Sequence, residues 1–291
     1  MSWLADPLQS TRDAAERAYR FAGDRRAWLV PIVLGLALLI VSALGGWQSP
    51  DDFFFAYLTG WSFLLTTALG GLLFLIFHHL TRASWSVTIN RINESLIWAF
   101  PLLFVLGLPL LFGMHDLYHW THAELYDPTG PAYDEILAGK RAYLNTPFWC
   151  ARMVLYFACW TIISYRLYTL SVRQDVDPDP SIPAKLRSTS AWGLPLTAVT
   201  LAFASYDILM SLDPHWFSTI FGVYFFAGGI LSAVAVITLV ALLLQRTGGL
   251  LKGVITREHY QDLGKYLFGF VVFWAYIAFS QYMLYWYGGI P

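Results

Sequence analysis

Histidine, aspartate and tyrosine side chains gather where one apolar segment of the chain ends. The run MHDLYHWTH contains His115, Asp116, Tyr118, His119 and His122. Histidines three or four positions apart share one face of a helix, and that spacing could bind a metal ion. The same rings also fit an aromatic belt at a membrane surface, which is the commoner role. We therefore expect a polar cluster here, with proton transfer or quinone contact as its chemistry and no metal site.

Two charged residues lie near the ends of the next two apolar segments. Arg152 follows the start of one segment, and Asp207 precedes the end of the next. Ionisable groups in such places are costly and indicate function by default. Asp207 could pass protons together with the histidines, or it could pair with Arg152 and hold two helices together. Both roles are open at this point.

Other polar residues have a simpler expected role. Asp213 and His215, in the run DPHW, predict the N-terminal cap of the following helix, with a proline in its first turn. Thr66 and Thr67 lie inside the second apolar segment, where hydroxyls usually bond back to their own helix. His78 and His79 end that segment, and we expect them to be solvated. These residues are secondary candidates for a proton path.

The composition indicates that most of this chain is surrounded by lipid rather than by water. Of its 291 residues, 57% are hydrophobic and 13% are charged, about half the usual charged fraction of a soluble domain. The formal net charge of −1 gives no reason to expect nucleic-acid binding. Cys150 and Cys159 are too far apart on a helix for a disulfide, and no CxxC motif is present to hold a c-type haem or an iron–sulfur cluster. We expect no cofactor bound by this chain alone.

Seven segments are long and apolar enough to cross a bilayer as helices. They predict an all-α integral membrane protein with one transmembrane domain over residues 28–291, after a cytoplasmic amphipathic segment over 1–27. The expected spans are residues 28–46, 53–80, 96–114, 147–170, 191–212, 216–244 and 266–287.

Basic residues fix the expected orientation. Fifteen of the 18 lysines and arginines precede the first span or cluster around the connections between spans two and three, four and five, and six and seven, with Arg166 just inside the end of span four. Because cytoplasmic loops carry the excess of basic residues, this alternation predicts a cytoplasmic N-terminus in a bacterial inner membrane. The histidine cluster, Arg152 and Asp207 then share the outer level of the membrane.

Several long runs resemble one protein family. They include HDLYHWTH (115–122), LYDPTGPAYDEILAGKRAYLNTPFW (125–149), DPHWFSTIFG (213–222) and FSQYMLYWY (279–287). These runs are similar to the F subunit of alternative complex III, a bacterial quinol:cytochrome c oxidoreductase. That subunit is the second of two NrfD/polysulfide-reductase-like membrane subunits in the complex. The resemblance extends over nearly the whole chain from span two onward.

The resemblance implies two four-helix bundles, with the second incomplete over this length of chain. It implies a subunit without its own redox centre, associated with a proton path. The implied partners are the sister NrfD-like subunit, an iron–sulfur subunit, c-type cytochrome subunits, lipids and in some cases a cytochrome c oxidase. Menaquinone or ubiquinone is the quinone that it could contact. The alternative that the residues leave open is a stand-alone quinone-binding or secondary transport protein.

Overall fold

The computed structural model describes residues 26–46, 49–176, 179–247, 251 and 253–289. The described residues form helices and connecting segments without a strand, and seven helical spans are long and apolar enough to cross a membrane. The expected all-α membrane fold is therefore confirmed. The predicted amphipathic segment at 1–27 lies almost entirely outside the described residues.

The long helices extend beyond the predicted apolar spans at most of their ends. Their bounds are α2 (Arg26–Gly46), α3 (Pro50–Thr81), α8 (Thr146–Val176), α9 (Ile182–Ile208), α10 (Phe221–Thr247) and α11 (Arg257–Gly288). Helices α9 and α11 each begin nine residues before the predicted start, because their first turns are polar and hydropathy detects only the part that crosses hydrocarbon. Helix α10 begins later than predicted, after a loop over residues 213–220.

The third span differs most from its prediction. It consists of α4 (Val87–Ile97), α5 (Phe100–Gly107) and the short 3₁₀ turn η1 (Leu108–Leu111), with a break at Trp98 and Ala99. Pro101 explains the break, because proline has no N–H and its ring clashes with the carbonyl four residues earlier. The span therefore begins at Val87 rather than at residue 96. Short helices α6 (Met114–Leu117) and α7 (Glu135–Lys140) follow before α8.

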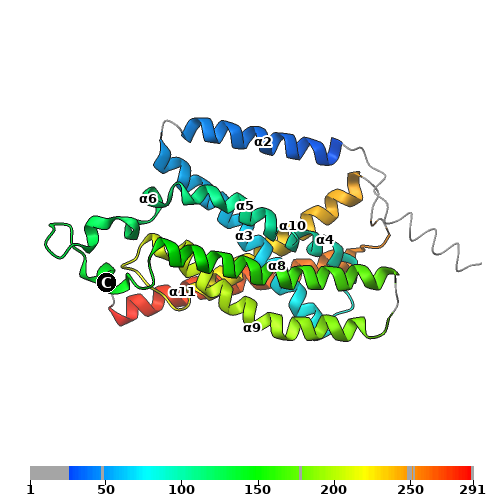
Figure 1. The fold of residues 1–291 in the computed structure, drawn as a ribbon. Coiled ribbons are helices and arrows are strands. Elements are labelled where there is room, and N and C mark those ends of the chain that lie inside the picture. The colour runs from blue at the N-terminus through cyan, green and yellow to red at the C-terminus, as the bar shows by residue number, and fades with distance from the viewer. Residues whose placement is uncertain (1–25, 47–48, 177–178, 248–250, 252, 290–291) are drawn as a thin grey trace, which may run out of the picture.

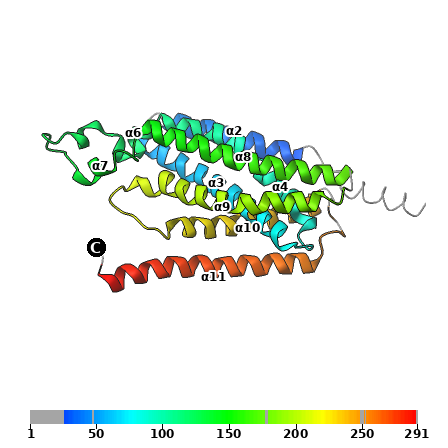
Figure 2. The same cartoon turned by 60° about the horizontal axis from the view of Figure 1, so that its bottom comes forward.

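Four spans form a closed bundle. Helices α3, α5, α8 and α9 contact one another in that order, and α9 contacts α3 again. Helix α10 packs across α3 and α9, and α11 lies along α10 on one side of the molecule (Figure 2). Helix α2 lies on another side and contacts α3 (Figure 1). The described helices thus form one bundle with α10 and α11 paired against it.

Two glycines allow α3 and α10 to approach closely. A Cβ atom added to Gly70 would lie 2.0 Å from the carbonyl oxygen of Gly229. A Cβ atom added to Gly229 would lie 2.8 Å from the carbonyl oxygen of Thr66. Small residues at helix crossings are the usual means of close packing in membranes, where apolar surface gains little from leaving lipid.

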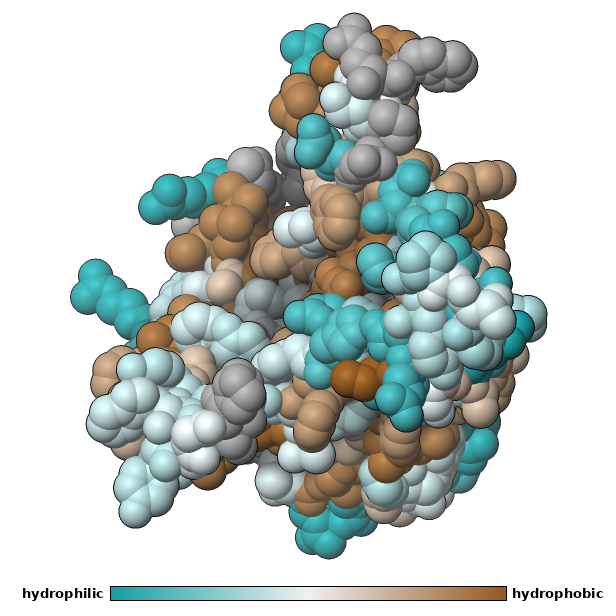
Figure 3. Space-filling view, turned by 90° about the vertical axis from the view of Figure 1, so that its left-hand side faces the viewer, coloured by the Kyte–Doolittle hydropathy of each residue, from teal (hydrophilic) through white to brown (hydrophobic). Residues whose placement is uncertain are grey.

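The two ends of the bundle differ in chemistry. The basic end, as we call it, contains the α3–α4, α8–α9 and α10–α11 connections, with Arg82 after α3 and with Lys185 and Arg187 in the first turns of α9. The loop end contains residues 112–145 and the α9–α10 connection. Figure 3 looks onto the loop end, where hydrophilic residues gather over the loops. This polar-ended, apolar-sided form is that of a multi-pass membrane protein.

Candidate functional site

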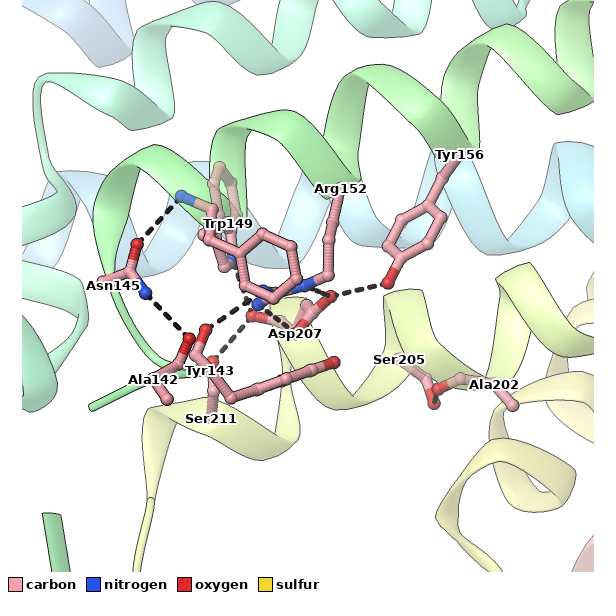
Figure 4. Close-up of polar contacts among 11 residues, drawn as sticks. Ala142, Tyr143, Asn145, Trp149, Arg152, Tyr156, Ala202, Ser205, Asp207 and Ser211 are labelled. Atoms are coloured by element: carbon pink, nitrogen blue, oxygen red, sulfur yellow. Dashed lines mark hydrogen bonds and ion pairs between the residues drawn. The ribbon is translucent and has the colours of Figure 1, made fainter. Parts of the chain in front are cut away.

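A buried ion pair joins α8 to α9 near the loop end. The Nε and Nη2 atoms of Arg152 donate hydrogen bonds of 2.8 Å to the two carboxylate oxygens of Asp207. Asp207 is 0% exposed and Arg152 is 7% exposed. Both side chains point into the space between the two helices (Figure 4). The structure thus brings together the two charged residues that the sequence places at one depth.

Neighbouring groups complete the coordination of this pair. The Tyr156 hydroxyl donates a 2.8 Å hydrogen bond to Asp207, and the Nη1 atom of Arg152 donates to the Tyr143 carbonyl oxygen at 3.0 Å. The guanidinium carbon lies 3.8 Å from the ring centre of Tyr143 and 4.4 Å from that of Phe148. A carboxylate with three donors and a charge partner is well stabilised as an anion. This geometry favours the helix-joining role of Asp207 over free proton exchange.

The end of α9 is tied to its surroundings through its carbonyl groups. Trp149 Nε1 and the Ser211 hydroxyl donate to the Asp207 carbonyl oxygen at 2.9 and 2.6 Å, and the Tyr118 hydroxyl donates to that of Ile208 at 3.0 Å. Burial, and then the Asp207 charge, raise the pKa of Tyr118 well above its usual value and that of Tyr143 to about 12. Both phenols are therefore protonated across the physiological range, and the Tyr143 hydroxyl is buried without a hydrogen-bond partner.

The histidine cluster lies outside this buried site. Helix α6 ends at Leu117 and Tyr118 is extended, so the predicted helical spacing of His115 and His119 is wrong. The rings of His115 and His122 have centres 3.9 Å apart, and His122 Nε2 donates to the His115 carbonyl oxygen at 3.0 Å. His115, Asp116 and His119 are exposed. Among the described residues, no group of three histidine, cysteine or acidic side chains could hold a metal ion.

Asp213 and His215 belong to a surface loop rather than to the start of a helix. Asp213 accepts a hydrogen bond of 3.2 Å from the His215 backbone, and α10 begins only at Phe221, so the predicted cap is wrong. His215 Nε2 instead lies 2.6 Å from a carboxylate oxygen of Asp134, which caps α7. This contact connects the α9–α10 loop to the segment before α8.

Thr66 and Thr67 lie at the contact between α3 and α10. The Thr67 hydroxyl bonds to the Phe63 carbonyl oxygen at 2.7 Å and to the Ser232 hydroxyl at 2.8 Å, and Thr66 donates to the Phe225 carbonyl oxygen at 3.4 Å. These bonds follow the usual pattern of hydroxyls in membrane helices. They stabilise the helix contact.

A cleft of about 1530 Å³ opens at the basic end. It contains His78 and His79, which the sequence predicts to be solvated, but His78 is 5% exposed. Its Nδ1 atom donates to the Phe74 carbonyl oxygen at 2.5 Å, and its Nε2 atom is buried without a partner. The predicted solvation is therefore wrong for His78.

Glu94 is the residue of this cleft that the sequence reasoning missed. It is 1% exposed, and its carboxylate pairs with Arg91 at 2.8 Å. Because the predicted third span begins at residue 96, the sequence leaves Glu94 in the connection that precedes it. The signal was present in VTINRINESLI, whose apolar positions recur at helical spacing and place Glu94 on a helix.

A column of buried polar side chains extends along α8 and α9 from Asp207 toward this cleft. Ser190, Thr197, Thr200 and Asp207 share one face of α9, because Gly193 and Ala204 continue the same helical spacing between them. On α8, Tyr156, Trp160 and Ser164 follow Arg152 at four-residue intervals, and Trp160 Nε1 donates to the Thr200 hydroxyl at 2.8 Å. The hydroxyls of Ser164, Ser190 and Thr197 are buried without a hydrogen-bond partner.

The sequence matches no known protein family profile and no curated protein.

Proposed function

We propose that this chain is a membrane subunit that conducts protons within a quinol-oxidising respiratory complex related to alternative complex III. The observation that carries the proposal is the polar column between α8 and α9. Three of its hydroxyls lack partners, and such buried groups are the ones that bind internal water and so allow proton hopping. The sequence resemblance described above supports membership of such a complex.

The column suggests a half-channel with a direction. At the basic end it stops at Ser190, one helical turn from Leu186 in the lining of the wide cleft, where Glu94 is a buried carboxylate. At the loop end it stops at the saturated Arg152–Asp207 pair. Protons would therefore enter at the basic end, which the positive-inside rule assigns to the cytoplasm of a bacterial inner membrane. This direction differs from the expectation from the sequence, which placed the proton-handling site at the outer level of the membrane, around the histidine cluster.

The redox chemistry belongs to the partners in this proposal. Iron–sulfur and c-type cytochrome subunits would carry electrons from menaquinol or ubiquinol to a cytochrome c or a terminal oxidase. The chain supplies a proton route and a surface for the sister NrfD-like subunit. Purifying the natural complex tests this membership, and co-purifying iron–sulfur and multihaem c proteins are expected. A chain that purifies alone as a homo-oligomer would instead support a stand-alone quinone-binding or transport protein.

Thr197→Val tests the proton path, because it removes an unpaired hydroxyl and preserves the shape of the side chain. We expect fewer protons moved per quinol oxidised by the complex in liposomes, measured with an enclosed pH-sensitive dye. The matched control is Thr59→Val, since the exposed Thr59 hydroxyl bonds only to the Phe55 carbonyl oxygen of its own helix. Equal proton movement in the two variants, with quinol oxidation intact, would exclude the column as the route.

A further inference from the structure

The cleft at the basic end has one polar wall and one apolar wall. Arg82, His78 and His79, at the end of α3, and Arg187, near the start of α9, are part of its polar lining. Val240 and Leu244, on the last turns of α10, are part of its apolar lining. A cleft with charge on one side and hydrocarbon on the other suits an amphipathic ligand.

The cleft contains more positive than negative charge. Arg91 contacts the carboxylates of Glu94 and Asp175, so these two acids share one partner. Arg82 and Arg187 line the same cleft and have no ion pair with any residue in the described part of the chain. Three arginines against two carboxylates leave one positive charge, which a single phosphodiester group would neutralise. Arginine is well suited to phosphate, because its planar guanidinium can donate two parallel hydrogen bonds.

His78 adds a hydrogen-bond acceptor beside the arginines of the polar wall. Because the Nδ1 atom of His78 donates to the Phe74 carbonyl oxygen, the Nε2 atom of the neutral ring has a free lone pair. That Nε2 atom and the Nε2 atom of His79 are buried without partners. Buried polar atoms are normally satisfied, so the unpaired Nε2 acceptor of His78 favours a ligand that has a hydroxyl donor.

We propose that this cleft binds an anionic glycerophospholipid with a hydroxylated headgroup, such as phosphatidylglycerol. Its phosphodiester contacts Arg82 and Arg187, its headgroup hydroxyls lie on the His78 side of the cleft, and its acyl chains lie along α10. Leu239, next to the cleft-lining Val240 on α10, is 57% exposed, so exposed apolar surface adjoins the apolar wall on the side of the bundle. Free phosphate shares the anion chemistry but has no use for the apolar wall. This lipid site goes beyond the proposed proton path and does not depend on it.

Headgroup preference tests the proposal without any substitution. The full chain is purified in a neutral detergent, and its thermal midpoint is measured with added dioleoyl phosphatidylglycerol, dioleoyl phosphatidylcholine or inorganic phosphate. We expect phosphatidylglycerol to raise the midpoint by several degrees and to remain bound in native mass spectra, and the other two to do neither. Equal stabilisation by both lipids would overturn the proposal, as would full protection by inorganic phosphate.

Variants assign the binding to the cleft. The double variant Arg82→Gln/Arg187→Gln is expected to weaken phosphatidylglycerol binding at least tenfold. The matched control is Arg246→Gln/Arg257→Gln, which removes the same charge from the same end of the bundle outside the cleft. Equal losses in the two double variants would show a diffuse electrostatic effect and contradict the proposal. If the cleft variant does not fold, Arg187→Gln alone is compared with Arg246→Gln.

Discussion

Arg152 and Asp207 are separated by 55 positions in the sequence, yet their side chains form two hydrogen bonds of 2.8 Å in the interior of the bundle. The pair connects the second turn of α8 to the last turn of α9, close to the loop end. Tyr156, Tyr143 and Phe148 surround it, so neither charge faces lipid directly. Forming a buried ion pair costs the desolvation of both charges. Replacing one partner is more destabilising than replacing both, because it leaves the other charge buried without a counter-charge.

Asp207→Asn should therefore destabilise the chain strongly. The variant leaves the Arg152 guanidinium buried without a counter-charge, and we expect a loss of about 3–5 kcal/mol in the free energy of unfolding. Reversible unfolding in mixed detergent micelles measures this change. The double variant Arg152→Met/Asp207→Leu should recover much of the loss, because no unpaired charge remains.

Asp116→Asn, at an exposed carboxylate, is the control and should change stability by less than about 0.5 kcal/mol. A stable Asp207→Asn variant with lowered proton movement would instead support the relay role.

Gly70→Ala should separate α3 from α10. The added Cβ atom would meet the Gly229 backbone, which cannot move aside as a flexible side chain could. We expect a loss of roughly 3 kcal/mol or more from this overpacking, measured by the same unfolding experiment. Gly269→Ala, on α11, is the control, since no atom lies within 4 Å of the Cβ position there. Similar stability of the two variants would show that the helices separate at little cost.

The sequence predicts the helical class and the depth of individual residues better than it predicts their neighbours. Hydropathy identifies seven spans because each must cover the hydrocarbon, and depth places Arg152 and Asp207 together because both lie near the same end of adjacent helices. The break at Trp98 follows from Pro101 and could be predicted, but the burial of Glu94 depends on how α4 packs against α3, which no local pattern contains. His78 is similar, since its environment is set by Trp85 in the α3–α4 connection and Tyr266 on α11 as well as by its own helix.

Thr200→Val should cost stability through its neighbour Trp160. The indole N–H of the fully buried Trp160 donates to the Thr200 hydroxyl at 2.8 Å, and valine cannot accept this bond. A buried donor left without an acceptor costs about 1–3 kcal/mol. Thr169→Val is the control, because the Thr169 hydroxyl bonds to carbonyl groups of its own helix and is exposed. Unfolding midpoints that do not differ between these variants would argue that water replaces the lost acceptor.

Asp134 should make the α7 segment sensitive to acid. The Leu137 backbone N–H, and to a lesser degree His215, lower the pKa of Asp134. Because the folded pKa lies below the unfolded value of about 3.9, the stabilisation is complete above pH 4 and is lost as the pH falls through the folded value. The Ile136 and Leu137 amides should therefore be well protected from hydrogen exchange at pH 6 and less protected near pH 3. In Asp134→Asn, the protection of these amides should not change with pH.

His215→Gln keeps the backbone hydrogen bond, which is the larger cause of the lowered pKa, and should retain most of the pH dependence. A pH response that disappears in His215→Gln would instead assign the effect to the contact between Asp134 and His215.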